Sequence, residues 1–238
     1  MMDFWQAHQA RFFELANPKQ AFDVHSPGEH SLGVYSLGTY SLTPHSPTPN
    51  IGEHAPNVVV CASYKDNALQ LSYFIERCAW LDIPAPSQQR VGVRQDYLWQ
   101  ADCLECFFDT ADDTSYLELN VAFDGSFNLY QFDDYRTPSI MPPQQAMGEL
   151  STFVADELTI TKHGSATQFS VRHLTVKIAT KMNTETKTPT SMQLHHIHPC
   201  VILHLDHQPI YYAIQHACPP DFHDKAYWQR TTIIGSHS

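Results

Sequence analysis

Residues 115–132, SYLELNVAFDGSFNLYQF, constrain the fold of this chain more than any other segment. The apolar residues Leu117, Leu119, Val121 and Phe123 alternate along it with Tyr116, Glu118 and Asn120. A period of two residues is typical of a β-strand, because successive side chains point to opposite faces. The Asp124-Gly125 pair that follows is a preferred sequence for a tight hairpin turn. The segment therefore predicts an antiparallel hairpin with one apolar and one polar face.

Short segments of the same kind, separated by turn residues, follow one another from about Val58 onward. The first two are VVVCASY and ALQLSYFIE, which flank KDN and predict a second hairpin. The others are ADCLECFFD, STFVADELTI, TQFSVRHLTVKIAT, MQLHHIHPCVILHL, IYYAIQHA and YWQRTTII. Prolines fall between these segments, at Pro138, Pro142, Pro143, Pro219 and Pro220. About ten strands with few helical patterns predict an all-β chain folded as an antiparallel β-sandwich. The loop RTPSIMPPQQAMGEL is long enough to suggest a lid or a crossover.

The N-terminal part has a different texture. Residues 3–16 fit a short helix, although their apolar stripe is loose. The tract HSLGVYSLGTYSLTPHSPTP then repeats a five-residue unit: HSLGV, YSLGT, YSLTP. An odd period reverses the facing of a strand at each repeat, so one regular strand cannot present every repeat to the same side. We therefore expect residues 17–56 to form a mostly irregular arm.

Net charge and hydropathy narrow the classes of partner. The formal charge is -11 with histidines neutral, which argues against nucleic acid and against an anionic membrane surface. The sequence has no apolar run long enough for a transmembrane helix and no signal-peptide pattern at its N-terminus, so the expected location is cytoplasmic. The six cysteines are then expected to be mostly reduced.

The most conspicuous candidate for metal chemistry is LHHIHPCVILHLDH, residues 194–207. In a strand, His196, His198 and His204 share a face with Cys200 and Ile202. Two histidines at H-x-H spacing make half of a metal site, but the remaining ligands must come from elsewhere. The alternative is a half-solvated strand with a histidine-rich outer face. Cys103-x-x-Cys106 has zinc-knuckle spacing without a second pair, and in a strand its two sulfurs face opposite ways.

A set of aromatic and polar residues on neighbouring segments forms the second candidate: Trp99, Glu105, Glu118, Asn120, Tyr130, Tyr135 and Arg136. Flat rings stack on the C–H faces of sugars, and carboxylates and amides bond their hydroxyl groups. The alternative is that Trp99 and Tyr130 are core residues and that Glu118 pairs with Arg136 structurally. No nucleophile elbow, phosphate loop, dinucleotide fingerprint or zinc-protease motif is present in the sequence, so we expect no catalytic activity.

Three stretches, DYLWQADCLECFF, YLELNVAFDGSFNLYQFDDYR and YYAIQHACPPDFH, resemble the bacterial DOMON-like domain proteins, which are related to the type 9 carbohydrate-binding modules. The residues that match the family pattern are Trp99, Cys103, Glu105, Phe107, Tyr116, Glu118, Asn120, Gly125, Tyr130, Phe132, Tyr135 and Arg136. The late signature matches Tyr211–His216 and Pro220–His223, with Tyr212 in place of a tryptophan. The histidine-rich strand and the CFFD sequence depart from the pattern.

The resemblance covers roughly residues 42–234 and implies a jelly-roll type β-sandwich that binds a ligand. It divides the chain into an N-terminal extension, residues 1–41, and a DOMON-like domain, residues 42–238. Since DOMON relatives bind haem or sugars, three functions stay open. The first is a non-catalytic carbohydrate-binding or sensing module with no resident cofactor. The second is a haem- or transition-metal-binding module that uses His196, His198 and His204, with Met141, Met147 or Met192 as an axial partner. The third is a protein-interaction domain without a small ligand, in which the proline-rich arm docks on a partner or on the protomer itself.

Overall fold

The computed structural model describes residues 35–46, 55–65, 68–79, 81, 83, 90, 92–109, 114–162, 165–178, 194–205 and 207–231. Within them the chain is all-β, as the sequence predicts, with eleven strands and two 3₁₀ turns. The predicted N-terminal helix lies outside the described residues. No helix in the described part of the chain is long and apolar enough to cross a membrane.

The strands in chain order are β1 (Tyr35–His45), β2 (Val58–Lys65), β3 (Ala68–Glu76), β4 (Cys103–Asp109), β5 (Tyr116–Ala122), β6 (Phe127–Phe132), β7 (Gly148–Lys162), β8 (Ser165–Ile178), β9 (His196–Leu205), β10 (Gln208–Ala213) and β11 (Gln229–Arg230). The 3₁₀ turns are η3 (Leu98–Gln100) and η4 (Lys225–Tyr227).

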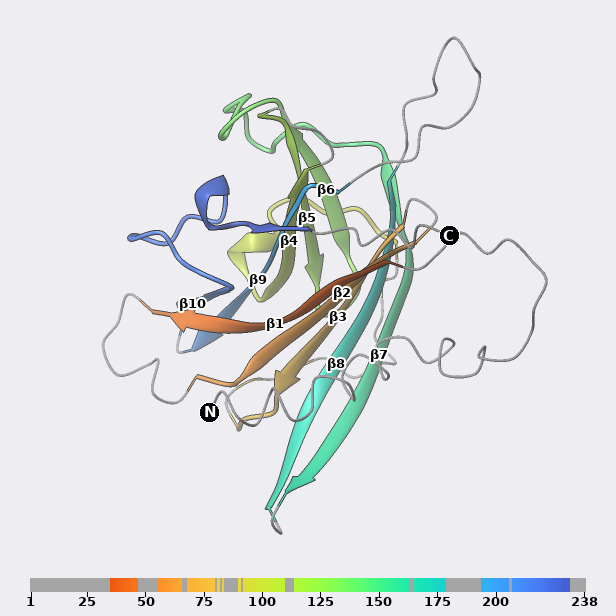
Figure 1. Ribbon diagram of the computed structural model, residues 1–238, viewed down its shortest axis with the longest axis vertical. Coiled ribbons are helices and arrows are strands. Elements are labelled where there is room, and N and C mark those ends of the chain that lie inside the picture. Colours follow the sequence, from red (N-terminus) through yellow and green to blue (C-terminus); the bar gives the residue numbers. More distant parts are fainter. Residues whose placement is uncertain are drawn as a thin grey trace, which may run out of the picture.

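One curled antiparallel sheet supplies both layers of the sandwich (Figure 1). Its order is β6-β5-β4-β9-β10-β1-β2-β3-β8-β7, and β11 branches from β9. Strand β1 belongs to both layers, because it pairs with β2 along most of its length and with β10 at Thr43–His45. The layer of β4, β5, β6, β9 and β10 carries the site described below, and the layer of β2, β3, β7 and β8 packs behind it.

The main hydrophobic core lies between these two layers. Leu104, Leu119 and Val201 of the first layer pack in one cluster with Val60 and Leu71 of the second, and all five are almost fully buried. Each such side chain contributes roughly 1.5–3 kcal/mol when it leaves water, so this cluster is the main source of stability. The core fixes one face of the β4-β5-β9 layer and leaves the other face for the loops.

The two predicted hairpins are confirmed. Strands β5 and β6 pair through Val121 and Phe127, and Gly125 in the turn has a φ of +87°, a left-handed conformation that glycine adopts without strain. Strands β2 and β3 pair up to Lys65 and Ala68 across the KDN sequence. The strand pairing on both sides of each turn sequence therefore agrees with the prediction.

Strand β1 differs from the expectation of an irregular arm over residues 35–45. The pairing with β2 shifts by one residue between Ser36 and Gly38, so Leu37 is an extra residue opposite β2. Such a bulge restores the facing that a five-residue period would reverse. As a result Leu37 and Leu42, five residues apart in successive repeats, both pack on the main core. The strand also crosses residues 41 and 42, where the sequence suggested a domain boundary.

The second face of the β4-β5-β6-β9-β10 layer is buried as well. The sequence predicted that Glu118 and Asn120 lie on a polar face of β5, and both are buried there. A second apolar cluster covers this face, with Phe107 of β4, Ile202 of β9 and Phe222 and Trp228 of the C-terminal loop. The pocket described next lies in this covering layer.

Candidate functional site

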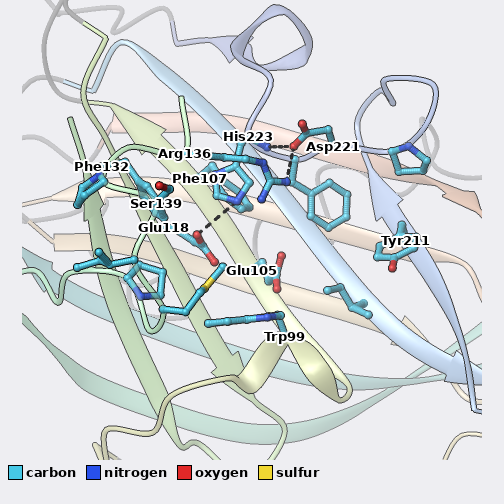
Figure 2. A pocket seen from close by; sticks show the side chains of 17 residues that line it. Trp99, Glu105, Phe107, Glu118, Phe132, Arg136, Ser139, Tyr211, Asp221 and His223 are labelled. Atoms are coloured by element: carbon cyan, nitrogen blue, oxygen red, sulfur yellow. Dashed lines mark hydrogen bonds and ion pairs between the residues drawn. The ribbon is translucent and has the colours of Figure 1, made fainter. Parts of the chain in front are cut away.

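A pocket of about 350 Å³ opens on the second face of this layer. Strands β4, β5, β6, β9 and β10 supply its floor, and loops far apart in the sequence supply its walls (Figure 2). Its lining residues are Trp99, Glu105, Phe107, Glu118, Phe132, Arg136, Pro138, Ser139, Ile140, Met141, Pro143, Ile202, Tyr211, Pro220, Asp221, Phe222 and His223. Aromatic rings and a small number of charged groups thus share one concave surface, which is the usual composition of a ligand pocket.

Two glutamates occupy the floor. Glu105 pairs across the strands with Asn120, and Phe107 pairs with Glu118, so the two carboxyl groups are diagonal neighbours on β4 and β5. Figure 2 shows both carboxylates directed at the space between Trp99 and His223. Glu105 is 2% exposed and Glu118 is 5% exposed.

The two carboxyl groups have unequal hydrogen bonding. Glu118 Oε1 accepts a hydrogen bond of 2.7 Å from Asn120 Nδ2. Glu105 Oε1 is buried and has no hydrogen-bond partner among the described residues. Burial and the neighbouring Glu118 carboxylate raise the pKa of Glu105 well above its ordinary value. Burial also raises the pKa of Glu118 to about 7, although the Asn120 hydrogen bond and the Arg136 charge oppose this.

A charged pair forms the rim on the opposite side. Arg136 donates to Asp221 Oδ1 at 2.9 Å, and the Tyr135 hydroxyl donates to Asp221 Oδ2. These bonds and the backbone N–H of His223 lower the pKa of Asp221, so its carboxylate is charged and the pair is neutral as a unit. The sequence left open an ion pair between Glu118 and Arg136, and the structure pairs Arg136 with Asp221 instead.

His223 links this rim to the floor. Its Nδ1 lies 2.7 Å from the Tyr116 hydroxyl, which also accepts from the backbone N–H of Arg136 at 3.1 Å. Either atom can donate in the contact between the hydroxyl and Nδ1, because the phenolic oxygen has one hydrogen and two lone pairs. The other ring nitrogen, Nε2, faces Glu118. That nitrogen lies 3.7 Å from Glu118 Oε2. Burial and the nearby Arg136 charge lower the pKa of His223 to about 3, so the imidazole is neutral at pH 7.

Trp99 forms the wall below the glutamates, at 5.7 Å from the Tyr130 ring in an edge-to-face arrangement. The Tyr130 hydroxyl donates to Asp96 Oδ1 at 2.8 Å, and Asn128 donates to the same oxygen at 2.7 Å. Arg94 holds the same segment by donating to Asn128 at 2.8 Å. Through this network β6 fixes the segment that carries Trp99.

The loop between β6 and β7 covers part of the pocket. The sequence suggested that this proline-rich loop is a lid or a crossover, and it carries the chain from one layer to the other. Pro138, Ser139, Ile140, Met141 and Pro143 all line the pocket. Ile140 and Met141 are nonetheless exposed, so the pocket presents apolar side chains at its entrance.

Four of the seven residues in the predicted ligand set line this pocket: Trp99, Glu105, Glu118 and Arg136. The other three stand behind the lining or at its rim, as partners of Glu118, Trp99 and Asp221; they are Asn120, Tyr130 and Tyr135.

Sequence reasoning did not include Phe107, Phe132, Tyr211, Asp221, Phe222 and His223 in the ligand set. The resemblance to the DOMON-like pattern was the available signal for all six, because Phe107 and Phe132 match its strands and the other four match its late signature.

The histidine strand β9 does not form one cluster. His196 lies at one end, with its Nδ1 3.0 Å from Asp109 Oδ2, and His204 lies near the other end, 3.1 Å from Asp102. They are about 26 Å apart along the strand at 3.3 Å per residue. His198 is buried between them, and burial lowers its pKa to about 3.

Among the described residues, no three His, Cys, Asp or Glu side chains are grouped so that they could hold a metal ion. Cys103 and Cys106 lie in different apolar clusters on opposite faces of β4, as the alternation of side chains along a strand predicts. Met141 and Met147 are exposed, and Met192 lies outside the described residues.

Comparisons with known proteins add little to this geometry. No protein-family model matches the chain, and no curated protein matches it at a significant level. The chain is similar to the crystal structure of a "putative carbohydrate-binding protein" from Bacteroides uniformis, with 10% sequence identity and a TM-score of 0.48. The similarity covers 82% of this chain and 85% of that one. A likeness of this size assigns neither a ligand nor a site residue, so the pocket itself has to carry the functional argument.

Proposed function

We propose that the chain is a non-catalytic module that binds a sugar-like ligand in the pocket between Trp99 and His223. The observation that carries this proposal is the composition of the pocket, in which two carboxyl groups face the same space as the Trp99 and Phe107 rings. Aromatic rings complement the C–H faces of a pyranose, and carboxyl oxygens accept hydrogen bonds from its hydroxyl groups.

The size and placement of the pocket support a small ligand. A volume of about 350 Å³ is at the lower end for ligand sites, and it suits one or two sugar rings better than an extended chain. Glu105 and Glu118 lie on neighbouring strands of the sheet, so their positions are set by backbone pairing. A binding site on rigid strands needs little reorganisation when the ligand enters.

The ordered motifs that resemble DOMON-like proteins support the same proposal. Three residues that match that pattern, Trp99, Glu105 and Glu118, lie together in the pocket although the pattern itself says nothing about distances. We therefore keep the relation to DOMON-like domains and type 9 carbohydrate-binding modules as part of the proposal.

Trp99 provides the direct test. The purified protein is screened on a glycan array, and the affinity of the best ligand is measured by calorimetry for the wild type, Trp99→Phe and Trp99→Ala. Loss of the ring removes stacking, so Trp99→Ala should weaken binding by tenfold or more, and Trp99→Phe should retain most of the affinity.

Two results would contradict the proposal. One is the absence of binding across the array by a folded sample, and the other is hydrolysis of the bound sugar during the same incubation. An absorption spectrum of the same sample tests the haem alternative, because a stoichiometric Soret band would favour it.

A further inference from the structure

The charges around the pocket do not balance. The carboxyl, guanidinium and imidazole side chains that line it are Glu105, Glu118, Arg136, Asp221 and His223. Arg136 and Asp221 neutralise each other at the rim, and His223 is neutral at pH 7. The carboxyl groups of Glu105 and Glu118 remain on the floor of the pocket. No further positively charged side chain among the described lining residues balances them.

The imbalance of charge is energetically more costly at Glu105 than at Glu118, although Glu105 is less accessible to solvent. The titratable groups that face it are Glu118 on β5, Cys103 on its own strand and Cys200 opposite it on β9. The Cys103 thiol gives Glu105 a hydrogen bond that favours its ionised form, but all three groups are acids and none of them supplies a positive charge. The buried Glu105 Oε1 is also without a hydrogen-bond donor among the described residues. An unsatisfied buried polar atom costs roughly 1–3 kcal/mol, and a buried unpaired charge costs more.

A ligand can supply what the protein does not. An ammonium group offers three N–H donors and one positive charge, and it can bridge two carboxylates that share a site. The surrounding rings of Trp99, Phe107 and Tyr211 are compatible with a cation, because the faces of aromatic rings attract positive charge. A neutral sugar supplies hydroxyl donors but leaves the two carboxyl groups without a counter-charge.

We infer that the pocket selects ligands that carry a cationic amine, with the ammonium between Glu105 and Glu118 and the attached ring against Trp99. The inference rests on the proposed function for the sugar ring, and it names amino sugars as the ligand class. It assigns Glu105 the role of charge partner and not merely that of a hydroxyl acceptor.

Proton release is a consequence that separates this mode from neutral binding. Burial raises the pKa of the Glu118 carboxyl group to about 7, and burial and Glu118 raise the pKa of Glu105. An ammonium stabilises the ionised forms, so binding lowers both pKa values and releases protons. Affinity for the amine should therefore rise between pH 5 and pH 7, by on the order of tenfold or more if one carboxyl group must ionise.

Calorimetry with matched ligands tests the inference. The 2-amino forms of glucose, galactose and mannose are compared at pH 7 with the parent hexoses and with the N-acetyl derivatives, and cyclohexylamine serves as an amine without hydroxyl groups. At least one amino sugar should bind tenfold or more tightly than both of its neutral counterparts. Its affinity should also fall as the pH is lowered from 7 to 5.

Two variants locate the effect. Glu105→Gln keeps the shape of the floor and removes one carboxyl group, so it should abolish the preference for the amine while leaving a folded protein. Glu149→Gln is the matched control, because Glu149 is an exposed residue of β7 paired with Lys177. It should leave both the preference and its pH dependence unchanged.

The outcomes distinguish the two proposals. Neutral hexoses that bind as tightly as their amino forms would overturn the amine inference and leave sugar binding intact. Binding of cyclohexylamine without any sugar would support the amine site and overturn the carbohydrate proposal. A folded protein that binds none of these ligands would overturn both.

Discussion

Strand β4 carries two carboxylates that are equally buried and differently partnered. Asp109 and Glu105 are four residues apart on the same face, and each is 2% exposed. Asp109 accepts from the backbone N–H of His196 at 2.9 Å and from Lys225 at 3.1 Å, and the His196 ring lies 3.0 Å away. Glu105 has no comparable cation, and one of its oxygens has no donor among the described residues.

The neighbouring strand explains the difference. Asp109 pairs across the sheet with His196 of β9, whereas Glu105 pairs with Cys200. A histidine and a lysine complete the hydrogen bonding of Asp109 within the fold, so that carboxylate stabilises the protein. A buried thiol does nothing equivalent for Glu105. The contrast supports the proposal that Asp109 serves structure and that Glu105 serves a ligand.

The largest effect we expect is the difference between amide substitutions at these two positions. Asp109→Asn removes the charge that Lys225 and His196 face, and it should lower the free energy of unfolding by about 3 kcal/mol. Glu105→Gln removes a carboxyl group whose ionisation is disfavoured by burial, and it should leave that free energy unchanged or raise it by about 1 kcal/mol. Urea unfolding at pH 7 measures both.

The matched chemistry of these substitutions makes the comparison sharp, because each exchanges one oxygen for an NH₂ group. Equal destabilisation by the two variants would show that Glu105 has a structural partner equivalent to that of Asp109. The contrast between the two carboxylates would then be lost, and with it the main support for a ligand at Glu105.

The second effect concerns Glu118 and the pH dependence of stability. Burial raises its pKa from the ordinary 4.5 to about 7 in the folded protein, so its contribution to stability is fully present below pH 4.5 and is lost as the pH rises through 7. This displacement of the pKa corresponds to roughly 3 kcal/mol. The quantity to measure is the free energy of unfolding of Glu118→Gln minus that of the wild type.

This difference should increase by roughly 2–3 kcal/mol between pH 4.5 and pH 7, because the variant lacks the penalty for ionisation. Taking the difference also cancels His198 and His223, whose lowered pKa values destabilise the fold as the pH falls below 6.5. A difference that stays constant across this range would mean that Glu118 is as well solvated in the folded protein as in the unfolded one.

The sequence predicted the strands correctly where the turn residues and the two-residue period of apolar residues indicate the same element, as in the hairpin around Gly125. They did not predict β1, because a single extra residue at Leu37 changes which side of the strand each repeat faces. Nothing in the spacing of the repeats locates such a bulge. The position depends on pairing with β2, which is a tertiary contact.

The floor of the site was more predictable than its walls. Because strands alternate, the sequence placed Glu118 with Asn120 on one face of their strand and Glu105 on a neighbouring segment. The pairing of β4 with β5 then brings Glu105 and Glu118 to the same face. The burial of this face depends on Phe222 and His223, which follow Glu118 by about 100 residues in the sequence, and on the loop that carries Ile140. Such loop residues have no period, so only their resemblance to a family motif could point to them. The histidines of β9 looked like a set by sequence, but each has a different environment in the fold. His196 lies against Asp109, His198 is buried, and His204 is eight residues from His196 along the strand.

The smallest effect we expect is at the other end of the β4–β9 pair. Asp102 accepts from the backbone N–H of His204 at 2.7 Å and lies 3.1 Å from its ring, so the contact resembles the one at Asp109. Both side chains are about a quarter exposed, however, and water screens the charge and can replace the lost contact. Asp102→Asn also retains an oxygen that accepts from the backbone. It should lower the free energy of unfolding by about 0.5 kcal/mol in the same urea experiment. A loss as large as that of Asp109→Asn would show that the hydrogen-bond and ion-pair partners of these carboxylates, and not their burial, determine how much each contributes to stability.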